Sequence, residues 1–396
     1  MSFSLSDEQR QIQDTIRRVA MDKVAPRAAA IDADATYPQD MFDLLRDLGL
    51  FTLPFPSQYG GEIGANGSDQ NGGGSMLSAC IAVEELCRVC YNTAYLLVVQ
   101  WVPYGAILAG GSQAQKDRYL PGLASGDLRG AISTTEAQSG SDVAGIRTKA
   151  ERVAGGYCLN GAKIWCTNSS VADFVLVAAR IADDQGSDET AKKRDALNLF
   201  IVERDTPGFT IGQPEDKMSA RGIPSCPLFL DDVFIADENR LGAEGQGFKI
   251  IMEAFNQSRP IIGARGVGLA QGAMDLAIDF VRQRAAFGQQ VSEFQGVRWM
   301  IADMAIQTEA ARGLVYRAAA MVDAGISGIE LSQAAAKAQD TAMAVATDAV
   351  QLFGAAGISN DYPVNRYFRD AKVLQIVEGT NQIQRNIIAN NLLGRT

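Results

Sequence analysis

The chain has 396 residues, a hydrophobic fraction of 47% and a net charge of −10, which allows two or three domains with a substantial core. The negative charge disfavours general nucleic-acid binding, because the phosphate backbone attracts surfaces rich in Lys and Arg. The sequence has no histidine, which excludes Ser-His-Asp and Cys-His nucleophile activation and any zinc site that needs imidazole. Proton transfer near neutral pH therefore falls to Asp, Glu, Tyr, Lys or Cys, and no metal is expected.

Cysteine content and apolar runs indicate the compartment. Six cysteines in a chain of this length favour a reducing cytoplasm over a disulfide framework. Charged residues or Gln interrupt every apolar run, so no membrane span is expected. The first residues, MSFSLSDEQRQ, have neither the basic start nor the apolar stretch of a signal peptide. We therefore expect a cytoplasmic protein without a membrane segment.

Residues 1–128 are expected to form an N-terminal helical domain. Ser6 followed by Gln9 is a capping-box signature at the start of a helix. Pro38 begins a short helix with apolar residues at helical spacing, which ends at Gly49. Gly, Asn and Ser residues predict a loop over 59–75, and a further helix begins near Met76.

Residues 129–242 are expected to form a middle β domain. Gly155-Gly156 and Asn160-Gly161 each predict a tight hairpin turn. No helix of useful length separates the strands, so an antiparallel sheet or barrel is expected. The predicted strands cover residues 131–135, 149–153, 157–159, 174–178, 198–202 and 228–234.

Residues 243–396 are expected to form a C-terminal domain of long helices. The helical period holds over residues 246–284, 293–323, 329–353 and 378–393. The fold class is therefore α+β and mostly α, with two helical domains flanking a small β domain. Pockets often form at such junctions, so a cleft is expected where the three domains meet.

Two motifs look functional but lack the context that would support them. The run Gly263-Ala-Arg-Gly-Val-Gly268 loosely matches a dinucleotide-binding loop, yet it lies inside a helical stretch with no preceding strand. Close helix packing through small residues explains it better. Cys87 and Cys90 form a single C-x-x-C with Cys80 nearby, and buried free thiols are the better interpretation because no second pair accompanies them.

Five segments resemble motifs of the acyl-CoA dehydrogenase family, in the family's order and over nearly the whole chain. They are TTEAQSGSD at 134–142, KIWCTN at 163–168, RQRAAFG at 282–288, QLFGAAG at 351–357 and VEGTNQIQR at 377–385. The resemblance implies a C-terminal four-helix bundle and a bound FAD. It also implies the α,β-dehydrogenation of an acyl-CoA thioester to a trans-2-enoyl-CoA.

The resemblance identifies Glu378 as the catalytic base, with Arg259 close to its carboxylate. From local sequence alone, a Glu just before a helix is more simply a carboxylate that stabilises the helix dipole, and the resemblance reverses that preference. Glu378 is expected to take the α-proton while flavin N5 takes the β-hydride. Some relatives place their base on another helix, where this chain has Ser258. A serine cannot serve, which supports Glu378.

The resemblance also implies the cofactor and substrate contacts. Trp165 is expected to pack against the flavin, although an aromatic in a hairpin core is an equal local alternative. Arg284 and Phe287 are expected to contact the FAD of a neighbouring subunit. The expected FAD contacts are Thr134, Thr135, Gly140, Ser141, Trp165, Thr167, Arg284, Phe287, Gln351, Gly354, Thr380 and Gln382. The expected substrate contacts are Ser141, Phe255, Asn256, Val377 and Gly379.

The resemblance implies a homo-oligomer, most often a dimer of dimers, and an electron-transfer flavoprotein as electron acceptor. The alternatives are an acyl-CoA oxidase that uses oxygen and a non-catalytic partner subunit that binds flavin or acyl-CoA. A sulfinate-removing relative is a further alternative, which Glu378 disfavours. The sequence departs from the family at Ala137 and Gln138, where Pro and Gly are usual, and at Val377, where straight-chain enzymes often have Tyr. The acyl group therefore stays open.

Overall fold

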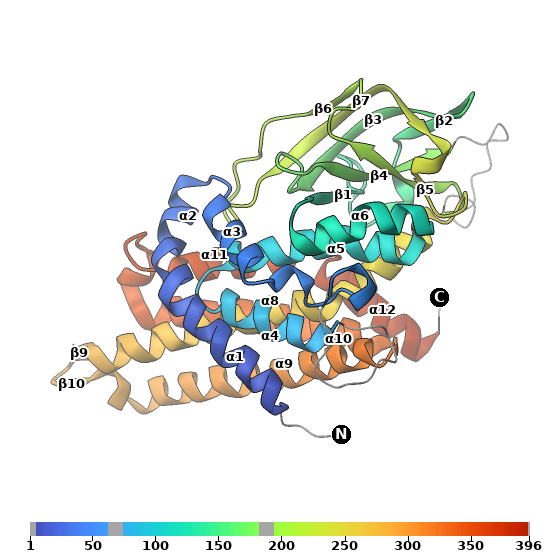
Figure 1. The fold of residues 1–396 in the computed structure, drawn as a ribbon. Coiled ribbons are helices and arrows are strands. Elements are labelled where there is room, and N and C mark those ends of the chain that lie inside the picture. The colour runs from blue at the N-terminus through green and yellow to red at the C-terminus, as the bar shows by residue number, and fades with distance from the viewer. Residues whose placement is uncertain (1–4, 62–73, 182–193, 395–396) are drawn as a thin grey trace.

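A computed structural model describes residues 5–61, 74–181 and 194–394, in which helices lie below and around one β domain (Figure 1). The N-terminal helices are α1 (Asp7–Val19), α2 (Ala28–Asp34), α3 (Gln39–Asp47), α4 (Met76–Cys87), α5 (Tyr91–Gly110) and α6 (Gln113–Ser125). The capping box is confirmed, because Ser6 Oγ accepts from Gln9 N at 3.1 Å and Gln9 Oε1 accepts from Ser6 N at 2.9 Å. Most of the predicted loop over 59–75 lies outside the described residues.

Helix α5 corrects one expectation about apolar runs. By length and composition α5 could cross a membrane, as could the stretch Ile329–Ile358. Helix α5 contains Asn92 and Gln100 but no charged residue. The helix is instead a core element: nearly all of its residues are buried against neighbouring helices and β1. The amide nitrogen of Gln100 is satisfied there, since it donates to the carbonyl oxygen of Leu123 at 3.1 Å.

The middle domain is one sheet with strand order β6-β7-β3-β2-β4-β5-β8, and β1 pairs with β4. The strands are β1 (Gly130–Ser133), β2 (Lys149–Val153), β3 (Gly156–Thr167), β4 (Phe174–Ile181), β5 (Leu197–Glu203), β6 (Phe209–Ile211), β7 (Ser225–Ala236) and β8 (Arg240–Leu241). The expected antiparallel pairing holds for most neighbours, but β1 and β2 each pair parallel to β4. The sheet is therefore mixed.

One of the two expected hairpins is correct. A hairpin joins β2 to β3 there, with Ala154 and Gly155 as the turn and Gly156 as the first residue of β3. The hairpin predicted at Asn160-Gly161 is wrong, because β3 runs straight through these residues. Gly161 instead lies at a register shift between β3 and β7, with φ of +152°. A Cβ there would lie 2.7 Å from Thr148 Oγ1, so this glycine serves a bulge and a close approach.

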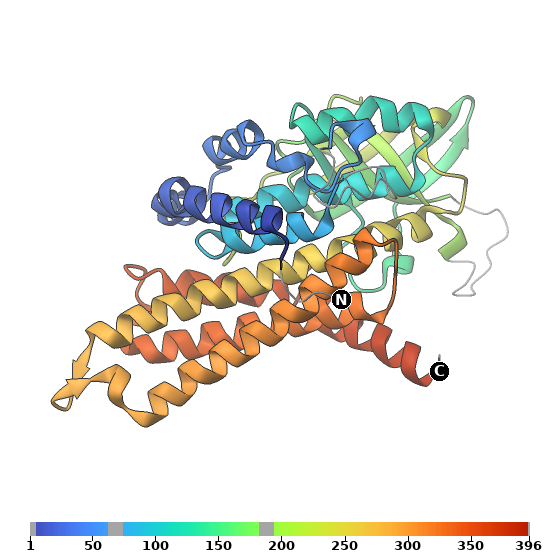
Figure 2. The same cartoon turned by 60° about the horizontal axis from the view of Figure 1, so that its bottom comes forward.

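The C-terminal domain consists of long helices that extend away from the β domain (Figure 2). They are α8 (Gly247–Gln283), α9 (Gln295–Asp323), α10 (Ile329–Phe353), α11 (Val364–Leu374) and α12 (Asn381–Leu393), with a hairpin of β9 (Ala285–Ala286) and β10 (Gln289–Gln290) between α8 and α9. The boundaries expected near residues 128 and 242 fall between α6 and β1 and between β8 and α8.

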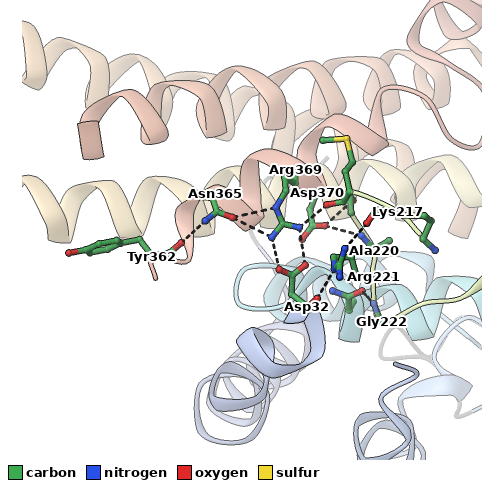
Figure 3. A network of polar contacts seen from close by, with 12 residues as sticks. Asp32, Lys217, Ala220, Arg221, Gly222, Tyr362, Asn365, Arg369 and Asp370 are labelled. Atoms are coloured by element: carbon green, nitrogen blue, oxygen red, sulfur yellow. Dashed lines mark hydrogen bonds and ion pairs between the residues drawn. The ribbon is translucent and has the colours of Figure 1, made fainter. Parts of the chain in front are cut away.

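A polar network joins the three domains (Figure 3). Arg369 on α11 forms an ion pair with Asp32 on α2, with Nη1 3.0 Å from Oδ1. The next residue, Asp370, is buried and accepts from Ser219 Oγ at 2.9 Å and from Ala220 N at 3.1 Å. Ser219 and Ala220 lie on the connection between β6 and β7. Adjacent residues of α11 therefore hold the N-terminal and middle domains in place.

Candidate active site

Glu378 lies in the turn between α11 and α12, in a backbone conformation that aims its side chain inward. Its φ is +57° and that of Gly379 is +90°, and such left-handed conformations are unusual for a residue with a Cβ and often occur at functional sites. Thr380 follows as the N-cap of α12, with its hydroxyl accepting from Ile383 N at 3.2 Å. The Glu378 side chain is only 14% exposed.

The partner of Glu378 is Arg265 on α8, which is completely buried. Arg265 Nη2 donates to Glu378 Oε1 at 2.7 Å, while the second carboxylate oxygen, Oε2, is buried and has no partner within the described residues. Burial acts to lower the pKa of Arg265, but Tyr91 and Glu378 raise it more. The guanidinium therefore stays charged beside a carboxylate that is only partly satisfied.

Two tyrosines of α5 complete the surroundings of Arg265. Arg265 Nη1 donates to Tyr91 Oη at 3.1 Å. The guanidinium carbon lies 5.7 Å from the ring centre of Tyr91 and 4.5 Å from that of Tyr95. Burial raises the pKa of the Tyr95 hydroxyl, and the nearby positive charge of Arg265 acts against this rise. The ring of Tyr95 thus packs against the guanidinium of the Arg265–Glu378 pair.

The segments expected to bind the flavin lie side by side at this end of the sheet. Ile164 N donates to Thr135 O at 3.0 Å, which places Thr134 and Thr135 next to β3. Thr167 Oγ1 lies 3.1 Å from Ser225 Oγ on β7. The indole of Trp165 is 51% exposed, with φ of +58°. The core alternative for Trp165 is therefore wrong, and its ring is available for stacking.

A buried ion pair supports the loop that follows Thr135. The Glu136 carboxylate accepts from Lys163 Nζ at 2.7 Å, from Thr148 Oγ1 at 2.6 Å and from the backbone N–H groups of Arg147 and Thr148. Burial acts to raise the pKa of Glu136, but hydrogen bonds from Lys163 and Thr148 lower it to about 2. These hydrogen bonds hold neighbouring segments together, so this carboxylate has a structural role. It anchors the loop that carries Gly140 and Ser141, both exposed.

Arg259 lines a separate cavity of about 730 Å³ between α8, α12 and the connection from α9 to α10. Its contacts within the described residues include no bond to Glu378, since Arg265, six residues along α8, makes that bond. Burial lowers the pKa of Arg259 to about 10, and its Nε has no partner among the described residues. The cavity also includes Asn256 and Arg194. A guanidinium without a partner in such a wall suits an anionic ligand.

The remaining expected residues lie on the surface of the single chain or beside the base. Phe287 is 96% exposed in the turn between β9 and β10. Arg284, Gln351, Gly354 and Gln382 are also exposed, whereas Phe255, Val377 and Gly379 are half-buried. The structure thus pairs Glu378 with Arg265, against which the ring of Tyr95 packs. It leaves the residues expected to contact a neighbouring subunit open to solvent.

Comparisons with known proteins agree with this arrangement. The models of the acyl-CoA dehydrogenase N-terminal, middle and C-terminal domains match residues 6–127, 131–233 and 245–393. The chain is 41% identical to the cyclohexane-1-carbonyl-CoA dehydrogenase of Geobacter metallireducens, with 99% of each chain covered. Butyryl-CoA dehydrogenase from Megasphaera elsdenii superposes with a TM-score of 0.91 at 36% identity, covering 99% of this chain and 100% of that chain.

A chain in the structure of the electron transferring flavoprotein of Acidaminococcus fermentans also superposes, with a TM-score of 0.91, 35% identity and 100% coverage of both chains. These similarities define the protein as an oxidoreductase. The chain belongs to the acyl-CoA dehydrogenase family, whose members depend on FAD.

The residues present fit a flavin. An exposed indole at Trp165, the adjacent Thr135 and the hydroxyl of Thr167 offer a flat apolar surface bordered by hydrogen-bonding groups. An isoalloxazine ring needs both, because its faces are apolar and its edge is polar. These side chains would hold the ring beside the end of strand β3.

Sequence reasoning missed Arg265, Tyr91 and Tyr95. A signal for Arg265 was present, since it is the only charged residue in the small-residue run 263–268 and charged residues are rarely fully buried without a partner. That run was assigned only to helix packing. The packing assignment is confirmed: a Cβ at Gly266 would lie 2.7 Å from the Ala338 carbonyl oxygen on α10.

Proposed function

We propose that this enzyme oxidises the α,β carbon–carbon bond of an acyl-CoA thioester to a trans-2-enoyl-CoA, with Glu378 as the base. The observation that carries the proposal is the state of the Glu378 carboxylate. One of its oxygens is fixed by Arg265 and the other is buried without a partner among the residues that the structure describes. A carboxylate held in this way has an unused lone pair for a proton.

Removal of a proton next to a thioester carbonyl requires stabilisation of the negative charge that forms on the carbonyl oxygen. The Glu378 N–H makes no hydrogen bond within the described residues, so it is available as a donor to that oxygen. One such donor contributes about 3 to 4 kcal/mol. FAD, when bound, supplies the acceptor for the β-hydride, which no amino-acid side chain can provide.

The coenzyme A arm is assigned to the cavity lined by Arg259 and Asn256. The support for this assignment is the Arg259 guanidinium without an acidic partner, together with Arg194 in the same wall. Guanidinium groups suit the phosphate oxygens of coenzyme A because their donors form a fork of matching geometry. In this assignment Arg259 binds substrate rather than contacting the base.

The oligomeric state, the electron acceptor and the compartment are part of the same proposal. A homo-oligomer is supported by the 96% exposure of Phe287, since a large exposed apolar side chain marks an interaction surface. An electron-transfer flavoprotein as acceptor is supported by the similarity to a chain in such a flavoprotein's structure. A cytoplasmic location is supported by six free cysteines, since disulfides are rare there.

Anaerobic titration of the purified yellow holoenzyme with a panel of acyl-CoA thioesters tests the reaction. We expect loss of the flavin absorbance near its visible maximum together with formation of enoyl-CoA. A non-catalytic subunit would keep its absorbance with every thioester. The same turnover in air separates a dehydrogenase from an oxidase, since only the oxidase would consume oxygen and release peroxide at the turnover rate without an added acceptor.

A further inference from the structure

The proposed reaction would leave the buried positive charge of Arg265 without an ionised partner. Within the described residues Glu378 is the only acidic side chain that contacts it. The other groups that face the guanidinium are the hydroxyls of Tyr91 and Tyr95 and the thiol of Cys87, and all of these are neutral at physiological pH. In the resting enzyme the pair Arg265–Glu378 is therefore balanced.

Turnover neutralises the negative member of this ion pair. When the Glu378 carboxylate takes the α-proton it becomes a neutral carboxylic acid. Arg265 cannot lose a proton in compensation, because a guanidinium stays protonated in proteins. A completely buried cation would then have no anionic partner, which is strongly unfavourable. An enzyme that oxidises a plain alkyl chain would meet this cost in every catalytic cycle.

The surroundings of Arg265 are also poorly suited to an alkyl chain. The groups around the guanidinium are the hydroxyl groups and rings of Tyr91 and Tyr95 rather than aliphatic side chains. Arg265 Nε is buried and has no partner within the described residues. A guanidinium with a free donor beside two hydroxyls has the composition of a carboxylate-binding site, because its fork matches two carboxylate oxygens.

We propose that Arg265, with Tyr91 and Tyr95, binds a carboxylate at the far end of the acyl group, so that the substrate is the coenzyme A thioester of a short dicarboxylic acid. This inference rests on the proposed function. The acyl group is short because Arg265 lies directly beside the base at 2.7 Å. The substrate carboxylate takes over Arg265, which releases Glu378 to face the α-carbon and keeps the cation paired after Glu378 is protonated.

The step is balanced without a further reactant. Glu378 gains the α-proton, the β-carbon gives a hydride to the flavin, and the α,β double bond forms. The distal carboxylate stays ionised and chemically unchanged. Its role is to hold the chain and to pair with Arg265.

Anaerobic rapid mixing of the holoenzyme with matched thioesters tests this inference. Glutaryl-CoA and pentanoyl-CoA have acyl groups of equal length that end in a carboxylate and a methyl group, and succinyl-CoA and butyryl-CoA form a second such pair. We expect the wild type to reduce its flavin at least about 30-fold more efficiently with the carboxylated member of one pair. This factor is the lower end of the loss that follows when one partner of a buried charge pair is removed. A wild type that prefers both methyl-ended thioesters overturns the inference and leaves the proposed function standing.

The variants Arg265→Gln and Arg265→Lys separate substrate binding from mere positioning of Glu378. We expect Arg265→Gln to abolish the preference ratio and Arg265→Lys to retain part of it. If Arg265 only positions the base, both thioesters slow equally, the ratio stays at the wild-type value and the inference fails. Arg259→Gln is the matched control, since it acts on the coenzyme A arm shared by all thioesters and should leave the ratio unchanged. Absence of bleaching by any thioester in the wild type would instead contradict the proposed function.

Discussion

Two carboxylates near the flavin-binding segment differ in how many hydrogen bonds they accept. Glu136 accepts from the side chains of Lys163, Thr148 and Gln138 and from two backbone N–H groups. In the described part of the chain, Glu378 accepts from Arg265 alone and keeps one oxygen free. A fully satisfied carboxylate is a poor base because protonation would break several hydrogen bonds. This difference supports a structural role for Glu136 and the proposed role of Glu378 as the base.

The Glu136–Lys163 pair yields a stability prediction. Lys163→Met leaves a buried carboxylate without its cation, and breaking such a pair costs about 3–5 kcal/mol. We expect a clear fall in the thermal unfolding midpoint, measured by circular dichroism, with loss of bound flavin as the loop after Thr135 loosens. The double variant Glu136→Gln/Lys163→Met should recover part of the loss because no charge is left buried. Equal midpoints for wild type and Lys163→Met would contradict this account.

At the residue scale the sequence identified Glu378 but not its partner. The family motif contains the base, so its position follows from the resemblance. The partner is set by the rotation of α8 against α5, which local sequence does not specify. Arg259 and Arg265 lie six residues apart on the same helix, and only tertiary packing decides which of them contacts the carboxylate.

The packing of α8 determines where Arg265 lies. Gly266 follows it directly, and the approach of α10 at this point leaves no room for a side chain. Any change that separates α8 from α10 therefore also moves the guanidinium relative to Glu378.

Gly266→Ala tests the close approach of α8 and α10. The added Cβ would lie 2.7 Å from the Ala338 carbonyl oxygen, which forces the helices apart, and overpacking of this kind costs about 1–3 kcal/mol. We expect a lower unfolding midpoint together with slower flavin reduction. Gly313→Ala on α9 is the control, because nothing lies within 4 Å of its Cβ position and Ala favours a helix. A Gly266→Ala protein as stable as the control would refute the packing argument.

At the element scale the helices of the C-terminal domain are the most predictable part. The range 329–353 expected from periodicity is the observed extent of α10, because a long apolar stripe fixes a helix locally. The middle domain is less predictable. Asn160-Gly161 has the composition of a turn, but β3 passes through it because β7 pairs with β3 on both sides. Strand pairing between distant residues overrides the local turn preference.

At the scale of the whole molecule, α11 holds the three domains in register. Arg369 pairs with Asp32 of the N-terminal domain and Asp370 binds the middle domain through Ser219 and Ala220. Burial raises the pKa of Asp370 to about 6, although these hydrogen bonds act against the rise. The domain junction therefore contains a carboxyl group that binds its proton more tightly in the folded than in the unfolded chain.

The raised pKa of Asp370 at the domain junction predicts that the stability of the fold depends on pH. Because the folded chain binds the Asp370 proton more tightly, this group's contribution to stability falls as the pH rises from about 4 to about 6, with a slope of at most 1.4 kcal/mol per pH unit. Asp370→Asn keeps the acceptor oxygen but cannot titrate. We expect the unfolding midpoint of Asp370→Asn, relative to wild type, to rise between pH 4.5 and pH 6.5. A constant difference across this range would show that Asp370 does not titrate there.

The most direct test of the central claim is flavin reduction in Glu378→Gln. The amide has nearly the same shape as the carboxylate and cannot take a proton. After rapid anaerobic mixing with the best thioester of the panel, the variant should retain its flavin and reduce it at least 100-fold more slowly than wild type. A Glu378→Gln enzyme that bleaches at the wild-type rate would contradict the assignment of Glu378 as the base.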